Sequence, residues 1–184
     1  MIPLGVALAL VGIQRLGELR LARRHERRLR ARGAVEFGAG HYPVMVALHA
    51  GWFSALALAI PLQQPGDPAL LLAYLALQPL RYWAIAALGE RWTTRILVLP
   101  GHAPVRRGPY RWLRHPNYLV VALEIPLLPA AYGAWDLALA FGAANLLLLG
   151  WRIRIEERAL AWAEQARAPP AGSSAPAIRT PDLR

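Results

Sequence analysis

Apolar runs of helical length, separated by short polar or arginine-rich stretches, dominate the pattern along this chain. A helix needs about 20 mainly apolar residues to cross the hydrocarbon core of a bilayer. Five segments meet this requirement, the fourth of them when it is extended by its flanks: residues 2–21, 42–62, 68–88, 118–131 and 134–151. We therefore predict an all-α fold, an integral membrane helical bundle with five transmembrane helices.

The end of the chain departs from this pattern. Only Tyr132 and Gly133 separate the last two apolar segments, which predicts a tight helical hairpin. Residues 152–167 carry alternating charge, as in a short cytoplasmic helix at the membrane interface. From residue 168 the composition turns to Pro, Ala, Ser and Gly. The pattern thus predicts a membrane domain over residues 1–167 and a disordered cytoplasmic tail over residues 168–184.

The distribution of arginines predicts how the protein is oriented in the membrane. All 21 basic residues are arginine, and the net charge is +10. Residues 15–32 hold eight arginines, residues 91–114 hold six and the segment from Arg152 onward holds six, whereas residues 63–67 hold none. Because basic loops stay on the cytoplasmic side, we expect a multi-pass protein of the cell (inner) membrane with its N-terminus outside and its C-terminus inside.

The same distribution bears on partners. Arginines that lie between apolar spans suit anionic lipid headgroups, so we expect membrane lipid and no nucleic acid as a partner. The chain contains no cysteine, which excludes disulfides, thiolate metal sites and a cysteine nucleophile. The first apolar run lacks a basic leader region and a cleavage motif, which favours a retained helix. The oligomeric state is left open.

Residues 101–118 concentrate glycine, proline, histidine, tyrosine and arginine in a predicted cytoplasmic loop that ends at a membrane helix. Glycine and proline fix a tight backbone, and the other side chains offer hydrogen-bond donors at the boundary between water and membrane. The predicted hairpin would bring Arg152 and Glu156 back beside His115. A purely structural alternative is that these arginines and histidines extend to the interface and pair with Glu156 and Glu157.

The stretch closely resembles the isoprenylcysteine carboxyl methyltransferase family of membrane enzymes, whose hallmark is G-x-Y, R-H-P-x-Y and a later E-E. The corresponding segments here are Gly108-Pro-Tyr110, Arg114-His-Pro-Asn-Tyr118 and Glu156-Glu157. Together with Arg91-Trp-Thr-Thr-Arg95, they look most like the bacterial branch that O-methylates alkylresorcinols and alkylpyrones. The resemblance covers most of residues 15–166 and is strongest over residues 89–160.

This resemblance implies S-adenosyl-L-methionine as the cofactor and Arg152 as the residue that faces the methyl acceptor. It assigns ten residues to cofactor binding: His102, Ala103, Pro104, Val105, Tyr110, His115, Pro116, Asn117, Tyr118 and Glu156. Glu156 would meet the ammonium group or a ribose hydroxyl, and His115 and Tyr118 would donate to the carboxylate of the cofactor. The family's fold, a small helical membrane bundle, agrees with the five predicted spans.

Polar residues within the predicted spans are further candidates. Glu124 and Asn145 are costly in a membrane unless paired, so we expect them to bond to each other, with acceptor binding by Glu124 as the alternative. Arg81 is a second candidate partner of Glu124. His41 and His49 follow one face of the second span with Met45 between them, either as structural residues or as catalytic ones. Near the inner end of the first span, we expect ion pairs among Arg15, Glu18 and Arg20.

The leading hypothesis is an S-adenosylmethionine-dependent O-methyltransferase. Its acceptor would be a lipophilic small molecule, the hydroxyl of an alkylresorcinol or alkylpyrone-type lipid. A phenol has a pKa of about 10, so a general base that removes its proton speeds its methylation, whereas a carboxylate is already ionised at neutral pH. Candidate bases are His41, His49, Glu36 and Glu124, and Arg152, His41 and His49 are the predicted catalytic residues.

Three alternatives stay open at this point. The first is an isoprenylcysteine carboxyl methyltransferase, which acts on a carboxylate. The second is an NADPH-dependent membrane reductase, because such enzymes share a similar R-H-P-x-Y region and Arg106 and Arg107 would suit a 2'-phosphate. The third is a membrane scaffold without catalytic activity.

Overall fold

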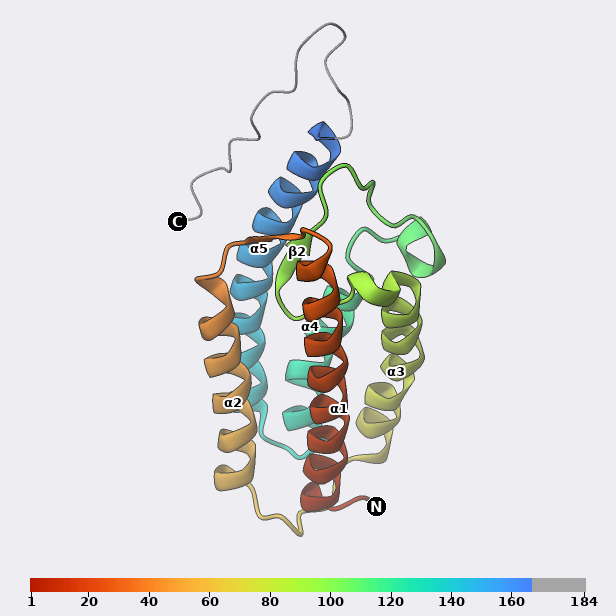
Figure 1. Cartoon of the computed structure of the whole chain (residues 1–184). Coiled ribbons are helices and arrows are strands. Elements are labelled where there is room, and N and C mark those ends of the chain that lie inside the picture. The colour runs from red at the N-terminus through yellow and green to blue at the C-terminus, as the bar shows by residue number, and fades with distance from the viewer. Residues whose placement is uncertain (167–184) are drawn as a thin grey trace, which may run out of the picture.

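A computed structural model, which describes residues 1–166, contains five α-helices in one bundle (Figure 1). They are α1 (Leu4–Ala31), α2 (His41–Ala59), α3 (Pro68–Leu88), α4 (Pro116–Ala131) and α5 (Trp135–Gln165). Each includes most or all of one predicted apolar segment, so the mostly helical fold is confirmed. The predicted tail over residues 168–184 lies outside the described residues.

Three of these segments are long and apolar enough to cross a membrane: His41–Ala59, Pro68–Arg91 and Trp135–Gln165. Helix α4 is equally apolar but shorter. Helix α1 is long, but arginines fill its second half, so only its first half is apolar. The three apolar helices suggest a multi-pass membrane protein, and a membrane crossing by α1 and α4 stays a prediction.

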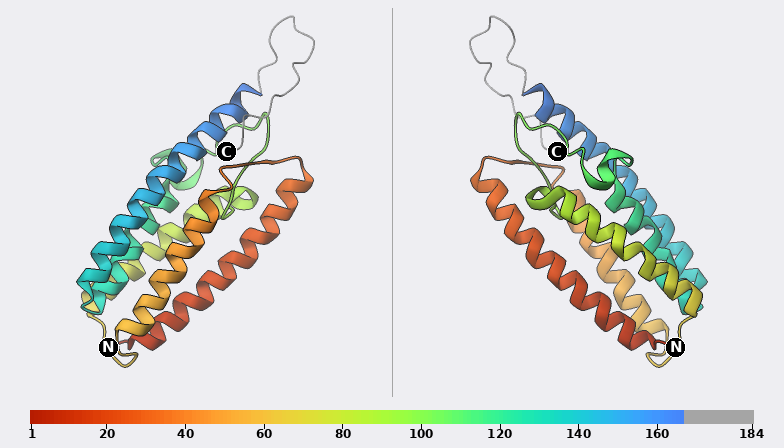
Figure 2. Two further views of the ribbon diagram at one scale, coloured as in Figure 1. Left: turned by 90° about the vertical axis from the view of Figure 1, so that its left-hand side faces the viewer. Right: turned by 90° about the vertical axis from the view of Figure 1, so that its right-hand side faces the viewer.

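The two ends of the bundle differ in chemistry. The N-terminus, the loop between α2 and α3 and the turn between α4 and α5 lie together at one end (Figures 1 and 2). Backbone hydrogen bonds join these segments, from Leu4 to Gln64 at 3.0 Å and from Asp67 to Ala131 at 2.7 Å. The arginine-rich second half of α1 and the arginine-rich loop between α3 and α4 lie at the other end. Charge is therefore segregated along the bundle as the sequence pattern predicts.

A small antiparallel sheet at the arginine-rich end corrects the all-α prediction. Strand β1 (Val35–Phe37) pairs with β2 (Ile96–Val98), with Val35 opposite Val98. Strands of three residues are too short to show a readable alternation of apolar and polar positions, which is why the sequence pattern missed them. The sheet covers the last turns of α5, because Phe37 and Ile96 pack against Ala159.

Helix α5 also corrects the prediction of a separate interfacial helix. It runs unbroken for 31 residues, from the turn at Gly133 into the arginine-rich end. Residues 151–165 contain no glycine or proline that would end a helix. Every second turn of this segment places a buried residue against the bundle or the small sheet, as Arg152 and Ala159 show. Arg154, Arg158 and Glu164 are exposed on the outside of this one long helix, whereas Arg152 is buried.

Four charged side chains form a buried ion cluster between α1, α3 and α4. Glu124 accepts hydrogen bonds from Arg15 and Arg81, both at 2.7 Å, and from Gln78, also at 2.7 Å. Glu18 accepts from Arg81 at 2.6 and 2.8 Å. Two arginines thus balance two glutamates, which lowers the high cost of burying each charge alone.

The hydrogen bonds of this cluster test two predictions about the polar residues within the spans. The predicted pairing of Arg81 with Glu124 is confirmed, whereas the predicted bond between Glu124 and Asn145 is wrong. Two guanidinium groups hold the carboxylate more strongly than an amide would. Asn145 instead donates to the backbone oxygen of Val121 at 3.3 Å, and its Oδ1 atom is buried without a partner among the described residues.

Candidate active site

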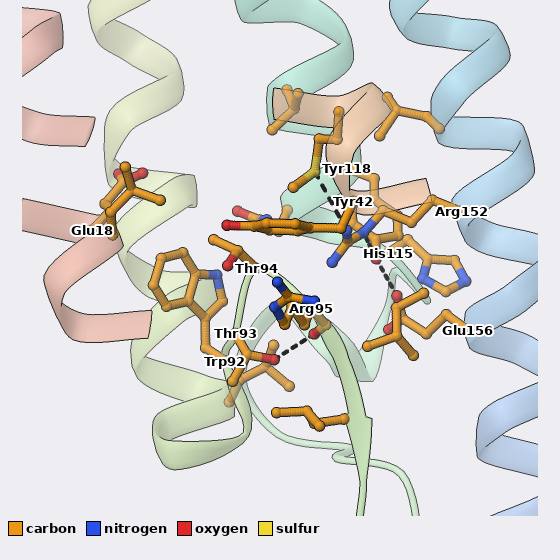
Figure 3. Close-up of a pocket in the computed structure, with 18 of the residues that line it drawn as sticks. Glu18, Tyr42, Trp92, Thr93, Thr94, Arg95, His115, Tyr118, Arg152 and Glu156 are labelled. Carbon is orange, nitrogen blue, oxygen red and sulfur yellow. Dashed lines mark hydrogen bonds between the residues drawn. The ribbon is translucent and has the colours of Figure 1, made fainter. Parts of the chain in front are cut away.

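A cavity of about 740 Å³ runs through the interior of the bundle, within the usual size range of ligand sites. Its membrane-level half, away from the loop, has mainly apolar residues such as Val11, Phe53 and Ile125 in its wall, and the four charged residues of the buried ion cluster also line the cavity. Its other half lies under the loop between α3 and α4, beside Tyr110 and Glu156. Figure 3 shows side chains from α2, the loop, α4 and α5 converging there. The cavity therefore joins an apolar compartment to a polar one.

Local backbone features hold the loop over the cavity. Arg91 donates to the carbonyl oxygen of Ala103 at 2.7 Å, and Gly101 donates to that of Ala163 on α5 at 2.9 Å. Gly108 has a φ of +58° and packs against α3, where an added Cβ would lie 2.8 Å from the Cβ of Ala87. Only glycine fits this position, and it begins the 3-10 helix η2 (Gly108–Arg111), which carries Tyr110.

Nine of the ten residues assigned to the cofactor line this cavity, and they come from the loop, from the start of α4 and from α5. The nine are His102, Ala103, Pro104, Val105, Tyr110, His115, Asn117, Tyr118 and Glu156. Pro116 is the exception, because it is fully buried as the first residue of α4 and starts that helix. The structure thus brings the predicted set together, and its contact with a cofactor stays a prediction.

A chain of hydrogen bonds crosses the middle of the cavity. The Tyr118 hydroxyl donates to a carboxylate oxygen of Glu156 and accepts from Nε of Arg152 at 2.7 Å (Figure 3). Nη1 of Arg152 contacts Nε2 of His41 at 2.8 Å and the sulfur of Met45 at 3.4 Å. The guanidinium group is therefore fixed by α2, α4 and α5 at the boundary between the two halves of the cavity.

The two candidate histidines differ in their hydrogen bonds. His41 is 1% exposed, is absent from the cavity wall and accepts from Arg152 through Nε2, while its Nδ1 donates to the carbonyl oxygen of Gly38. His49 lines the cavity, and its Nδ1 donates to the carbonyl oxygen of Met45 at 2.8 Å. Among the described residues, no group bonds to Nε2 of His49. Of these two histidines, only His49 therefore has a free ring nitrogen beside the cavity.

The two candidate carboxylates are both held by arginines. Glu36 lies outside the cavity wall and accepts from Arg30 and, at 2.6 Å, from Arg95. Burial alone would raise the pKa of Glu36, but these two hydrogen bonds and the charges of both arginines bring it below its ordinary value. Glu124 lines the cavity, yet both of its oxygens accept bonds in the buried ion cluster. Neither carboxylate has the free, basic oxygen of a general base.

Sequence reasoning assigned no role to Tyr42 and Arg95, which also line the cavity. The guanidinium carbon of Arg95 lies 4.0 Å from the ring centroid of Tyr42, a cation–π contact that joins the residue before β2 to α2 (Figure 3). Arg95 belongs to the Arg-Trp-Thr-Thr-Arg stretch that carries part of the family resemblance, so the sequence held a signal for it. Tyr42 offered none.

The donors and acceptors of the polar half fit S-adenosylmethionine, which carries an ammonium group, a carboxylate and an adenosine. Nε2 of His115 and Oδ1 of Asn117 are buried and make no hydrogen bond within the described residues, so both are available to a ligand. Glu156 supplies a carboxylate. Burial, followed by the nearby charge of Glu156, raises the pKa of Tyr110 far above its ordinary value, which keeps its hydroxyl as a donor.

The same geometry gives the NADPH alternative little support. Neither Arg106 nor Arg107 lines the cavity. Nε of Arg107 instead donates to the carbonyl oxygen of Ala87 at 2.7 Å and so fastens the loop to α3. A 2'-phosphate in the cavity would therefore not meet these two side chains in their present positions.

Comparisons with known proteins identify the same family that the sequence motifs of the site resemble. The model of the isoprenylcysteine carboxyl methyltransferase (ICMT) family matches residues 69–162. The uncharacterized protein YpbQ of Bacillus subtilis (strain 168) is 42% identical over 157 residues, which cover 83% of this chain and 94% of that protein. An uncharacterized protein of Haemophilus influenzae is 29% identical over 169 residues, which cover 87% of this chain and 96% of that protein.

No solved structure matches this chain. The family match nevertheless spans just over half of the 184 residues and includes the loop, α4 and the cavity-lining part of α5. The relative from Bacillus subtilis extends the similarity to most of the chain. The chain therefore belongs to the isoprenylcysteine carboxyl methyltransferase family of membrane methyltransferases.

Proposed function

We propose that this protein is an S-adenosylmethionine-dependent O-methyltransferase that acts on the hydroxyl of a long-chain alkylresorcinol or alkylpyrone. One observation carries the proposal: a single cavity joins a polar half beneath the loop to an apolar half at the membrane level, with Arg152 between them. The polar half suits the cofactor, and the apolar half suits the alkyl chain of a lipid.

The reaction needs the acceptor oxygen to be held in line with the donor carbon. Bound S-adenosylmethionine supplies a methyl group on a positively charged sulfur. Arg152 is fixed by Tyr118 and His41 and carries a permanent charge, so it would orient an acceptor oxygen and stabilise negative charge on it. Such positioning accounts for several kcal/mol of a reaction barrier in general.

The apolar half favours an acceptor that reaches the site from the bilayer. Its wall includes Leu16 of α1 and Val46 of α2, both about half exposed. In the proposed topology, the N-terminus is outside and the loop over the cavity faces the cytoplasm, where the soluble cofactor is available. The lipid and the cofactor would then reach opposite halves of one cavity.

Purified protein with methyl-labelled S-adenosylmethionine tests the proposal. We expect a labelled methyl ether from an alkylresorcinol or an alkylpyrone and little product from N-acetyl-farnesylcysteine. Arg152→Ala should lower the rate at least about 100-fold, because one fixed charge beside a developing oxyanion contributes about that much. Arg154→Ala is the matched control, since this exposed arginine lies on the same helix and outside the cavity wall.

The acceptor panel separates the two methyltransferase hypotheses. Turnover of farnesylcysteine alone would reject the hydroxyl acceptor and support the carboxylate one. An unchanged rate in Arg152→Ala would reject the role of this arginine.

A further inference from the structure

His49 lies at the point where a hydroxyl acceptor would meet the polar half of the cavity. It follows His41 and Met45 at intervals of four residues along α2, which places all three on one helix face. Met45 and His49 line the cavity, while His41 lies behind Arg152. Because His49 is two turns further into the membrane-level half than His41, it lies nearer to the part of the cavity that suits the lipid.

The hydrogen bond to Met45 sets the form of the His49 ring. A backbone oxygen can only accept, so Nδ1 carries the proton in this contact. In the neutral ring, Nε2 then keeps its lone pair. Since Nε2 has no partner within the described residues, this nitrogen is a free proton acceptor beside a ligand cavity.

Charged groups from three other helices face His49. They are Arg15 of α1, Glu124 of α4 and Arg152 of α5. The charge of Glu124 is balanced within the buried ion cluster. Arg152 instead bonds to Tyr118 and His41, which are both neutral. An acceptor that loses its proton beside His49 would therefore form its negative charge near the guanidinium group of Arg152, which would stabilise it.

We propose that His49 is the general base that accepts the hydroxyl proton of a phenolic acceptor. The proton moves to Nε2, which gives an imidazolium and an aryloxide. The oxygen then uses its electron pair to form the new bond to the methyl carbon, the C–S bond breaks and its electron pair stays on sulfur. His49 later releases the proton to water. This inference rests on the proposed methyltransferase function and names the residue that makes a hydroxyl acceptor possible.

Two acceptors that differ in acidity test the role of His49. An alkylresorcinol keeps its proton at neutral pH and needs a base, whereas a 4-hydroxy-6-alkyl-2-pyrone is a more acidic enol that is already largely ionised. His49→Gln retains an amide donor for the Met45 oxygen but has no basic nitrogen. We expect it to lower the rate with the resorcinol about 100-fold and the rate with the pyrone less than about threefold.

His41→Gln provides the contrast. His41 holds Arg152 and has no free nitrogen, so its loss should lower the rates with both acceptors by a similar factor. An S-adenosylhomocysteine titration of each variant verifies that the cofactor half is intact. His49→Asn repeats the test with a second amide, in case His49→Gln fails to bind S-adenosylhomocysteine.

A binding measurement gives a readout that is independent of turnover. A long-chain alkyl nitrophenol changes colour when it ionises, so its absorbance reports its pKa in the protein loaded with S-adenosylhomocysteine. We expect this pKa to be at least about one unit lower in the wild-type protein than in His49→Gln or in empty detergent micelles, because the imidazole takes the proton.

The outcomes are distinct. If the wild-type protein methylates neither acceptor, the proposed function fails. If it methylates both, and His49→Gln changes both rates equally or changes neither, His49 is not the base. A nitrophenol whose pKa in the wild-type protein equals that in micelles overturns the proposal as well, whether or not the variants fold.

Discussion

Arg152 depends on side chains from three helices, and the sequence alone predicts only part of this arrangement. Tyr118 and Glu156 belong to the family motif, so the approach of Tyr118 across the hairpin to Arg152 and Glu156 could be expected. His41 could not be placed in this way, because His41 and His49 share one helix face and look equivalent in the sequence. The difference between them arises from Arg152. Its guanidinium group donates to Nε2 of His41, whereas Nε2 of His49 has no partner among the described residues.

Adjacent glutamates allow a matched test of the cofactor half. Glu156 lines the cavity and accepts from Tyr118, whereas Glu157 lies outside the cavity wall, is 42% exposed at its side chain, and lies 3.4 Å from the exposed Arg114 and 3.7 Å from Nε2 of His115. Glu156→Gln should weaken S-adenosylhomocysteine binding more than tenfold, which corresponds to about 1.4 kcal/mol. Glu157→Gln should change it less than about threefold, as is usual for an exposed ion pair. Calorimetric titration measures both, and equal affinities in the two variants would reject the assignment of Glu156.

At the scale of helices, apolar length predicted where each helix begins more reliably than where it ends. Helix α3 has the predicted bounds because Asp67 caps its first turn and Gly89 follows its last residue. Helices α1 and α5 continue past their apolar parts as arginine-rich helices. Composition alone cannot distinguish such an extension from a separate helix. The buried ion cluster was partly predictable, since Arg81 and Glu124 each needed a partner, but the third partner, Arg15, depends on the packing of α1.

The positions of the helix ends predict the topology. Gln64 lies in the arginine-free loop after α2, and Arg111 lies in the arginine-rich loop before α4. Because the chain has no cysteine, Gln64→Cys and Arg111→Cys each introduce one unique thiol. A membrane-impermeant maleimide should label Gln64→Cys in intact cells and Arg111→Cys only after permeabilisation. The opposite pattern of labelling would invert the proposed orientation.

At the scale of the whole molecule, the arrangement of the bundle brings motifs that are separate in the sequence together in one site. The loop, the start of α4 and the far part of α5 enclose the polar half of the cavity, while α1 and α2 complete the apolar half. The polar half could be predicted from the sequence through the family resemblance. The apolar half could not, because most of its wall, apart from the buried ion cluster and His49, consists of apolar residues whose pattern only indicates a membrane helix. On this arrangement we propose that the polar half binds S-adenosylmethionine.

Isothermal titration of the purified wild-type protein with S-adenosylhomocysteine and, separately, with NADPH tests this claim most directly. S-adenosylhomocysteine shares the adenosine and amino acid groups of the cofactor and lacks the reactive methyl group, so it reports binding without turnover. We predict saturable binding of S-adenosylhomocysteine at one site per chain and no binding of NADPH. Binding of NADPH alone would indicate a reductase, and binding of neither ligand by the folded protein would contradict the methyltransferase function altogether.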